Sequence, residues 1–231
     1  MSDQARNDKV NTWIDTIVFD VSEMLAQHHV FWKVVKIIGE NSEIIATPFY
    51  YWLGESFKTS AAIAVRRIAE DSPKVIFLYK LFEELRKSPL LITRDYFVNH
   101  PVFFPNGPLS VIKQLSAHET FDKIVGEGKQ HLERTVIDED SKLLVAKAQT
   151  IKHYVDTHYA HRSKAPSSKP IPKLSDLDEC LGCLKHLAGK YYHLIKGIPC
   201  NFDIHSDYFD DWHSIFKSPW ITCDSGTTDA S

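Results

Sequence analysis

Residues 175–197 read SDLDECLGCLKHLAGKYYHLIKG, and this stretch shows most clearly what kind of fold the chain adopts. Apolar side chains recur in it at intervals of mostly three or four residues, which is the period of one helical face. They are Leu177, Leu181, Leu184, Leu187, Tyr191 and Leu194. Ser175 and the acidic residues after it come close to a capping box, and Gly197 is suited to end a helix. We therefore predict a long amphipathic helix here.

Other stretches of the chain have the same helical period. Apolar residues between 9 and 38 mark one face of a long first helix. Thr47-Pro48 and Ser72-Pro73 each place a proline where the first turn of a helix tolerates it, so each pair predicts a helix start. The acidic residues 138–140 favour a further start, because negative charge stabilises a helix N-terminus, and that helix is expected to continue to about Ala160.

The segments between these helices are less regular. Residues 99–110 hold three prolines and a glycine and predict an irregular connection. The next residues predict one or two short helices, which Gly126 and Gly128 would end. Residues 162–174 form a basic loop rich in proline and serine.

These elements together predict an all-α fold, a bundle of about six or seven helices. We expect the bundle domain to cover residues 8–197. Residues 198–231 are then a C-terminal extension, with a short helix around 208–216 and a frayed end.

Composition limits where the protein works. The chain has 231 residues, 43% of them hydrophobic, which is enough to build a sizeable core. Its net charge of -3 gives no general attraction to nucleic acid or acidic membranes. The N-terminus is polar, four cysteines are too few for a disulfide-rich module, and no stretch is apolar enough to span a membrane. We therefore expect a cytoplasmic protein without a membrane partner.

Cys180 and Cys183 are spaced as in some metal and redox sites. A structural zinc site needs four ligands, however, and the sequence has no second pair of this spacing. Cysteines three residues apart inside a helix are more typical of small core residues. We therefore predict neither a metal site nor a cofactor.

The densest group of polar side chains is KHYVDTHYAHR, at residues 152–162. Histidine is the side chain best suited to move protons near neutral pH, and His158 and His161 share a helical face. Asp156 lies five residues before His161, so the two meet only if the helix loosens there or another chain contributes. The alternative is structural, since cations favour a helix C-terminus and aromatic residues cover the edge of a core.

The run YAHRSK at 159–164, the polar loop after it and the helix 175–197 resemble the AbiU2-like branch of the HEPN superfamily. Arg66-Arg67, Asp71 and the stretch SPKVIFLYKLFEEL at 72–85 are also similar to that branch. The resemblance extends over residues 10–197. It implies a helical bundle, often a homodimer, of the kind associated with defence or toxin–antitoxin systems.

Many HEPN proteins are metal-independent ribonucleases whose motif pairs an arginine and a polar residue with a later histidine. His161 matches the histidine, but residues 154–156 hold no cation where the motif arginine would stand. Arg66, Arg67 or Arg162 would have to supply that charge from elsewhere. Arg66-Arg67 and Asp71 are also spaced for an ordinary ion pair within one helix.

The resemblance implies a role for each candidate residue. His161 would be the general acid or base, Asp156 would orient a partner group, and His158 is a further catalytic candidate. Phosphate would be attracted by the cations of the following loop, which are Arg162, Lys164 and Lys169.

Two functions remain open at this point. One is an RNA-directed protein of defence or toxin–antitoxin type that acts as a metal-independent endoribonuclease. The other is a non-catalytic helical module with a degenerate HEPN motif, whose helix end builds a dimer interface. The expected partners are RNA, a second copy of the chain, and an antitoxin or another protein.

Overall fold

The computed structural model describes residues 3–41, 48–68, 77–100, 110–160, 171–202 and 214. Within these ranges the secondary structure is helical, and the only β-type pairing is an isolated bridge between Thr93 and His131. The helices are α1 (Asp3–Glu40), α2 (Pro48–Ile68), α3 (Leu78–Lys87), a 3-10 turn (Pro89–Leu91), α4 (Arg94–Val98), α5 (Ser110–Val125), α6 (Arg134–Val155), a π-helical turn (Asp156–Ala160) and α7 (Leu174–Lys196). The predicted all-α bundle is confirmed.

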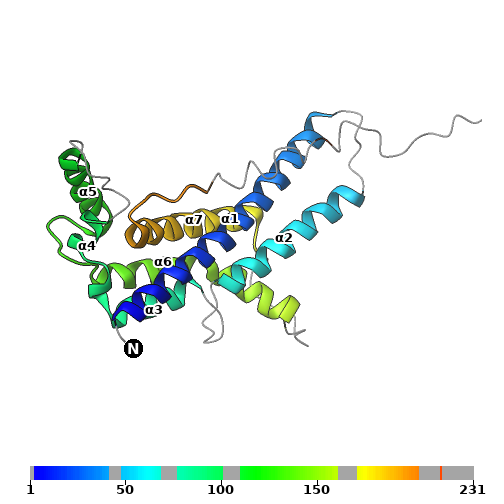
Figure 1. Cartoon of the computed structure of the whole chain (residues 1–231). Helices are drawn as coiled ribbons and strands as arrows, with labels where there is room; N and C mark the ends of the chain where they lie inside the picture. Colours follow the sequence, from blue (N-terminus) through cyan, green and yellow to red (C-terminus); the bar gives the residue numbers. More distant parts are fainter. Residues whose placement is uncertain are drawn as a thin grey trace, which may run out of the picture.

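Helix α7 packs against α1 and α6, while α2 packs against α6 (Figure 1). Its apolar face is fully covered, as its sequence predicts. Leu177, Leu184, Leu187 and Tyr191 have no exposed surface at all. The Tyr191 ring contacts that of Phe82 on α3, with 4.9 Å between the ring centroids. Burial of each large apolar side chain stabilises the fold by roughly 1.5–3 kcal/mol, so this face holds the bundle together.

Both ends of α7 lie close to the predicted positions. The helix begins at Leu174, one residue earlier than the sequence indicates, and the side chain of Asp176 accepts a hydrogen bond from the backbone N–H of Lys173 at 2.8 Å. This bond satisfies one of the N–H groups that a helix start leaves unpaired. Gly197 ends the helix at φ 73°, a left-handed conformation that glycine adopts without strain.

The start of α6 differs from the prediction. The helix begins at Arg134, so the acidic residues 138–140 lie in its second turn and do not cap it. Two of these acidic residues meet other helices. Arg86 of α3 donates to Asp138 at 2.7 Å, and Lys190 of α7 donates to Asp140 at 2.7 Å. Tertiary ion pairs, not the helix dipole, explain this acidic run.

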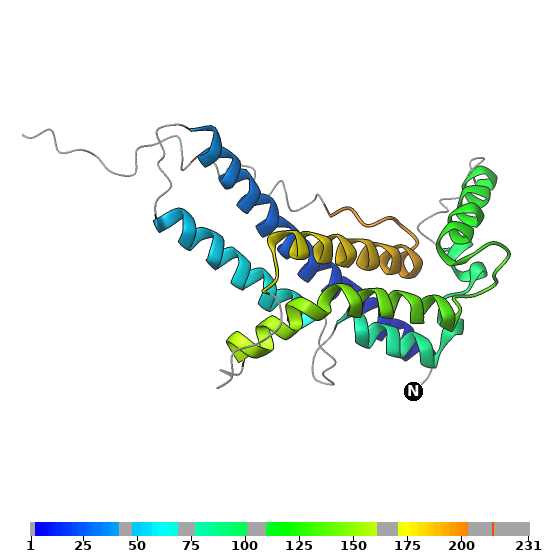
Figure 2. The ribbon, with the colours of Figure 1, turned by 180° about the vertical axis from the view of Figure 1, so that it is seen from behind.

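Helices α1 and α2 extend beyond α7 at one end of the bundle (Figures 1 and 2). The buried side chains of α1 lie mostly between Val10 and Met24, and only Phe31 is buried beyond them. Phe31 stacks on Phe57 of α2, with ring centroids 4.0 Å apart. The projecting part is therefore held mainly by contacts between α1 and α2 themselves.

The chain after α7 turns back along that helix. Phe202 is only 9% exposed and belongs to the hydrophobic core. Its ring lies against α7 at Gly189, where a Cβ atom would come within 3.3 Å of it. The first residues of the predicted C-terminal extension are thus packed on the bundle.

Several predicted features lie outside the described residues. These are the helix start at Ser72-Pro73, most of the irregular connection 99–110 and nearly all of the short helix 208–216. Residues 111–125 belong to one helix, α5, and Gly126 ends it with φ 126°. Within the described helices, none combines the length and apolar character that crossing a bilayer requires.

Candidate functional site

The polar segment at the end of α6 leaves the ordinary α-helical path. The α-helix stops at Val155, and residues Asp156–Ala160 continue as a π-helical turn. A π-helix repeats its hydrogen bonds every five residues instead of four, and such turns are rare and frequent at functional sites. The helix therefore loosens at Asp156, which is where contact between residues five apart would require it.

Asp156 meets a cation from a different helix. Arg66, in the last turn of α2, donates from Nε to Oδ1 of Asp156 at 2.5 Å. The two side chains are 26% and 35% exposed, so the pair lies at the surface and solvent reaches it. Its neighbour Arg67 points elsewhere and pairs with Asp20 of α1 at 3.4 Å. Of the two adjacent arginines, only Arg66 brings positive charge to the candidate site.

His158 is held in a defined orientation by the same turn. Its Nδ1 lies 3.0 Å from the backbone carbonyl oxygen of Tyr154. Because a carbonyl only accepts, Nδ1 carries the hydrogen in this contact, and Nε2 is the nitrogen suited to exchange a proton. The imidazole also packs on the Tyr154 ring, with centroids 4.5 Å apart. His158 is exposed, so a ligand can reach it.

Three hydroxyl groups connect the turn to α2. Tyr154 and Tyr159 have their hydroxyl oxygens 3.3 Å apart, and the Tyr159 hydroxyl lies 2.9 Å from that of Thr59. The hydrogen bond with Tyr159, together with burial, raises the pKa of Tyr154 to about 12. Tyr154 therefore stays protonated at neutral pH, where it can donate a hydrogen bond but cannot act as a base.

A shallow hollow of about 580 Å³ lies beside Tyr159. Its other walls come from α2 and are mostly polar; they are Glu55, Ser56, Thr59, Ser60 and Ile63. Serine and threonine hydroxyls can both donate and accept hydrogen bonds. The hollow thus offers a polar ligand a place next to the π-helical turn.

The structure describes two of the six residues that the sequence singled out. Asp156 and His158 both lie on the turn, Asp156 facing Arg66 and His158 facing Tyr154. The other four, His161, Arg162, Lys164 and Lys169, lie outside the described residues. Thr59 and Tyr159 were missed as members of the site, because only the packing of α2 on α6 brings them together.

The two cysteines of α7 are core residues. Cys180 has no exposed surface and Cys183 is 9% exposed. Burial raises the pKa of Cys180 to about 12 and also raises that of Cys183, so both stay as neutral thiols at neutral pH. Within the described part of the chain, no three histidine, cysteine or acidic side chains are grouped to share a metal ion.

The chain was also compared with known proteins. No family model matches it, and no curated protein or solved structure is significantly similar to it.

Proposed function

We propose that this protein is an RNA-directed, HEPN-like bundle of a defence or toxin–antitoxin system, which cleaves RNA as a homodimer without a metal ion. The observation that carries the proposal is the contact of Arg66 with Asp156, which lies five residues before His161 in the chain. It supplies, from α2, the positive charge missing from the motif segment of α6. The resemblance of residues 159–197 to HEPN proteins supports the same assignment.

The chemistry assigns each group a role. Cleavage beside a ribose 2′-hydroxyl needs one group to take its proton and one to protonate the leaving oxygen, and His161 and His158 are suited to both tasks. A guanidinium has five donors in a planar fork and can bridge a carboxylate and a phosphate, which is the role proposed for Arg66. Asp156 orients that guanidinium. Arg162, Lys164 and Lys169 attract the RNA backbone.

The π-helical turn supports the role of Asp156. Its hydrogen bonds join residues five apart, and Asp156 stands five positions before His161 in the sequence. An aspartate at that place would also hold a protonated histidine by charge. Two copies of this helix end, brought together in a dimer, would line one cleft with both sets of groups.

The test is cleavage of tRNA and total RNA by the purified protein in EDTA. We expect the parent protein to cleave and His161→Ala to be at least ~100-fold slower, because it lacks the proton-transfer group. Arg66→Ala is expected to lose a similar factor through weaker phosphate stabilisation. Arg67→Ala is the matched control, since it removes the same charge one residue away and leaves Asp156 paired; it should cleave within about twofold of the parent.

Two results would overturn the ribonuclease assignment. One is His161→Ala cleaving as fast as the parent protein. The other is Arg66→Ala and Arg67→Ala losing equal activity, since the loss would then reflect general charge and not the contact with Asp156.

A second candidate function is a non-catalytic dimerisation module. The observation that favours it is a set of exposed apolar side chains on α2, namely Phe49, Tyr51, Trp52 and Ile63, of which Ile63 lines the same hollow as the exposed Tyr159. Exposed apolar groups gathered in one place commonly mark a protein interface, and aromatic residues are enriched in such interfaces.

Oligomeric state decides between the two candidates when combined with the RNA assay. We expect Tyr51→Lys with Trp52→Lys to convert a dimer into a monomer in analytical ultracentrifugation. Leu90→Lys is the control, because Leu90 is as exposed as Tyr51 but lies on the 3-10 turn. A dimer that depends on Tyr51 and Trp52 yet neither binds nor cuts RNA would establish the module and exclude the enzyme.

A further inference from the structure

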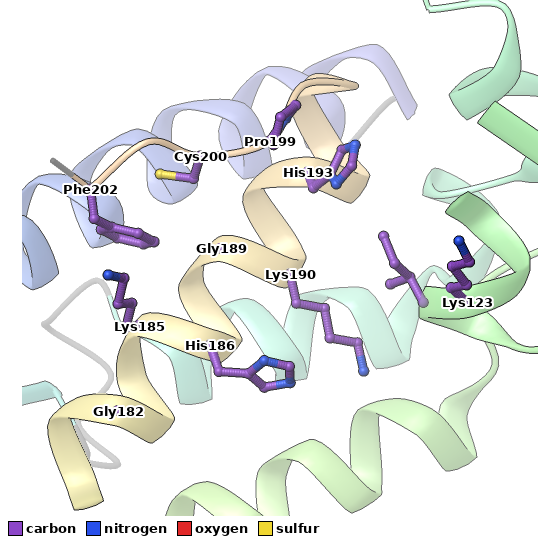
Figure 3. A pocket seen from close by; sticks show the side chains of 11 residues that line it. Lys123, Gly182, Lys185, His186, Gly189, Lys190, His193, Pro199, Cys200 and Phe202 are labelled. Atoms are coloured by element: carbon purple, nitrogen blue, oxygen red, sulfur yellow. The ribbon is translucent and has the colours of Figure 1, made fainter. Parts of the chain in front are cut away.

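A second pocket lies on the exposed face of α7, away from the elements that form the candidate site. Its volume is about 600 Å³, within the range of small-molecule sites. Figure 3 shows its walls, with α7 and residues 199–202 on one side and Lys123 of α5 on the other. The α7 residues that line it are Gly182, Lys185, His186, Gly189, Lys190 and His193, which share one helical face.

The pocket carries an excess of positive charge. Lys190 is neutralised by Asp140, 2.7 Å away. Lys123 and Lys185 are exposed, and within the described residues neither has a carboxylate at ion-pair distance. Among the described residues, no acidic side chain lines the pocket. Among the described residues, these are two ammonium groups without a carboxylate partner at one concave surface, and such a surface favours an anionic ligand.

The histidine nearest the end of α7 adds a neutral polar group. Burial lowers the pKa of His193, so its imidazole is uncharged at neutral pH and can both donate and accept a hydrogen bond. Its ring packs against Phe97 of α4 with centroids 5.4 Å apart, which fixes its place in the wall. A ligand group that accepts and donates hydrogen bonds can be bound there.

Two glycines of α7 line this pocket, and only Gly182 leaves open space beside it. A Cβ atom added at Gly182 would have no atom within 4 Å, so packing does not require a glycine there. At Gly189 a Cβ atom would approach the Phe202 ring to 3.3 Å, so close packing explains that glycine. Glycine inside a helix lowers its stability relative to alanine. Gly182 therefore leaves space on this face of α7, three residues before Lys185.

We propose that this pocket binds a small ligand with a phosphate or diphosphate group. Lys123 and Lys185 attract the charged group from opposite sides of the pocket, and the apolar part of the ligand lies on Ile124 and Pro199, which also line it. Lys190 remains paired with Asp140 and so holds this part of α7 against α6. The site uses α5, α7 and residues 199–202. Its test is therefore independent of the proposed ribonuclease site on α2 and the turn after α6.

The test is calorimetric titration of the full chain with pyrophosphate as the probe. We expect saturable binding of one pyrophosphate per chain, and at least ~100-fold weaker binding after Lys123→Gln with Lys185→Gln. The control is Lys33→Gln with Lys36→Gln on α1, which removes the same total charge at a distance from the pocket. Absence of binding to the parent protein, or an equal loss in both double variants, would overturn the proposal.

A second variant tests the open space beside Gly182 without removing charge. Gly182→Leu places a side chain in the pocket, and the helix interior should be stabilised by it because leucine is a better helix former. We expect an unchanged or higher melting temperature together with loss of pyrophosphate binding. Unchanged binding would contradict the role given to that space. If pyrophosphate does not bind but single-stranded RNA binds through Lys123 and Lys185, the face is an RNA surface and the small-ligand proposal is wrong.

Discussion

Asp140 of α6 and Asp156 of the π-helical turn after it have similar contacts but very different surroundings. Asp140 accepts from Lys190 at 2.7 Å and from the Tyr191 hydroxyl at 2.8 Å, and only 8% of it is exposed. Asp156 accepts from Arg66 at 2.5 Å, but its side chain is 35% exposed. The two bond lengths alone would suggest equal strength. Burial decides otherwise, because a buried charge depends on its partners whereas an exposed one can be solvated by water.

The difference in burial makes Asp140 a structural residue and leaves Asp156 available to a ligand. Losing a partner at Asp140 leaves a charge inside the protein, which makes the site a poor place for chemistry that breaks ion pairs. Asp156 can exchange Arg66 for water or for a ligand group at little cost. The start of α6, at Asp140, is therefore fixed in the bundle. The turn after its end, at Asp156, is accessible to solvent and to a ligand.

Replacing Asp140 should have the largest effect on stability. In Asp140→Ala the Lys190 ammonium and the Tyr191 hydroxyl lose their acceptor, and we expect the free energy of unfolding to fall by about 3 kcal/mol. Asp156→Ala should lower it by less than about 1 kcal/mol. Urea unfolding followed by circular dichroism measures both. Equal losses would show that the π-helical turn is as structural as the core, and the contrast between the two aspartates would be wrong.

Alkaline pH should lower the stability of the folded protein through Tyr191, which is buried beside Asp140. Burial and the Asp140 charge raise the pKa of Tyr191, so the folded protein keeps this proton when the unfolded chain, with an ordinary pKa of about 10, loses it. This contribution is complete below pH ~10 and is lost as pH rises above it. Tyr191→Phe should unfold more easily by about 1.5 kcal/mol at pH 7 and show a shallower loss of stability between pH ~9 and ~11.

The control for that experiment is Tyr51→Phe, because the Tyr51 side chain is exposed. Its stability should match that of the parent protein at each pH. A Tyr191→Phe protein with an unchanged alkaline slope would contradict the role assigned to the buried hydroxyl.

A double-mutant cycle on Arg66 and Asp156 measures how much the exposed ion pair contributes to stability. We expect a coupling energy of about 0.5 kcal/mol at low salt, falling further at about 1 M salt because exposed charges are screened. The measurement is the unfolding free energy of the two single variants and the double variant. A coupling above about 2 kcal/mol that ignores salt would mean that the pair is effectively buried.

The smallest effect is expected for the hydroxyl contact between Thr59 and Tyr159. Thr59→Val removes one partner of a solvent-accessible hydrogen bond, and water can replace it. The change in unfolding free energy should stay below about 0.5 kcal/mol in the same denaturant assay. A loss above about 1 kcal/mol would show that the contact fixes the π-helical turn to α2.

The helices themselves could be predicted where their signals are local. The apolar spacing of residues 177–194 and the glycine at 197 place α7 within a residue of its observed bounds, and Thr47-Pro48 marks the start of α2. Both signals depend on neighbours within one or two turns. The start of α6 was predicted wrongly, because the acidic residues 138–140 serve contacts to α3 and α7 that lie far away in the sequence.

The candidate site could be predicted only in part for the same reason. The histidine-rich segment was visible as a cluster of residue types, and Asp156 was singled out. Its partner Arg66 is separated from it by 90 positions, so local spacing pointed instead to an ion pair with Asp71, which lies outside the described residues. The π-helical turn has no reliable sequence signal. The second pocket left one trace in the sequence, the glycines at 182 and 189 on one face of α7, but Lys123 joins them only through packing.

The unequal lengths of α1 and α7 have a consequence for how the molecule opens. At about 1.5 Å per residue, the 38 residues of α1 extend roughly 57 Å, against roughly 35 Å for the 23 residues of α7. One continuous helix therefore consists of a portion packed in the core and a portion beyond Met24 whose described contacts are fewer, chiefly Phe31 with Phe57 of α2 and His28 with Asp178 of α7. Amide hydrogens in the first portion exchange with solvent only when the whole bundle unfolds, while those beyond Phe31 exchange by local fraying. If a second chain covers the part of α1 beyond Phe31, amide hydrogen exchange in that part slows as protein concentration rises. Exchange in this one segment would then measure dimer formation.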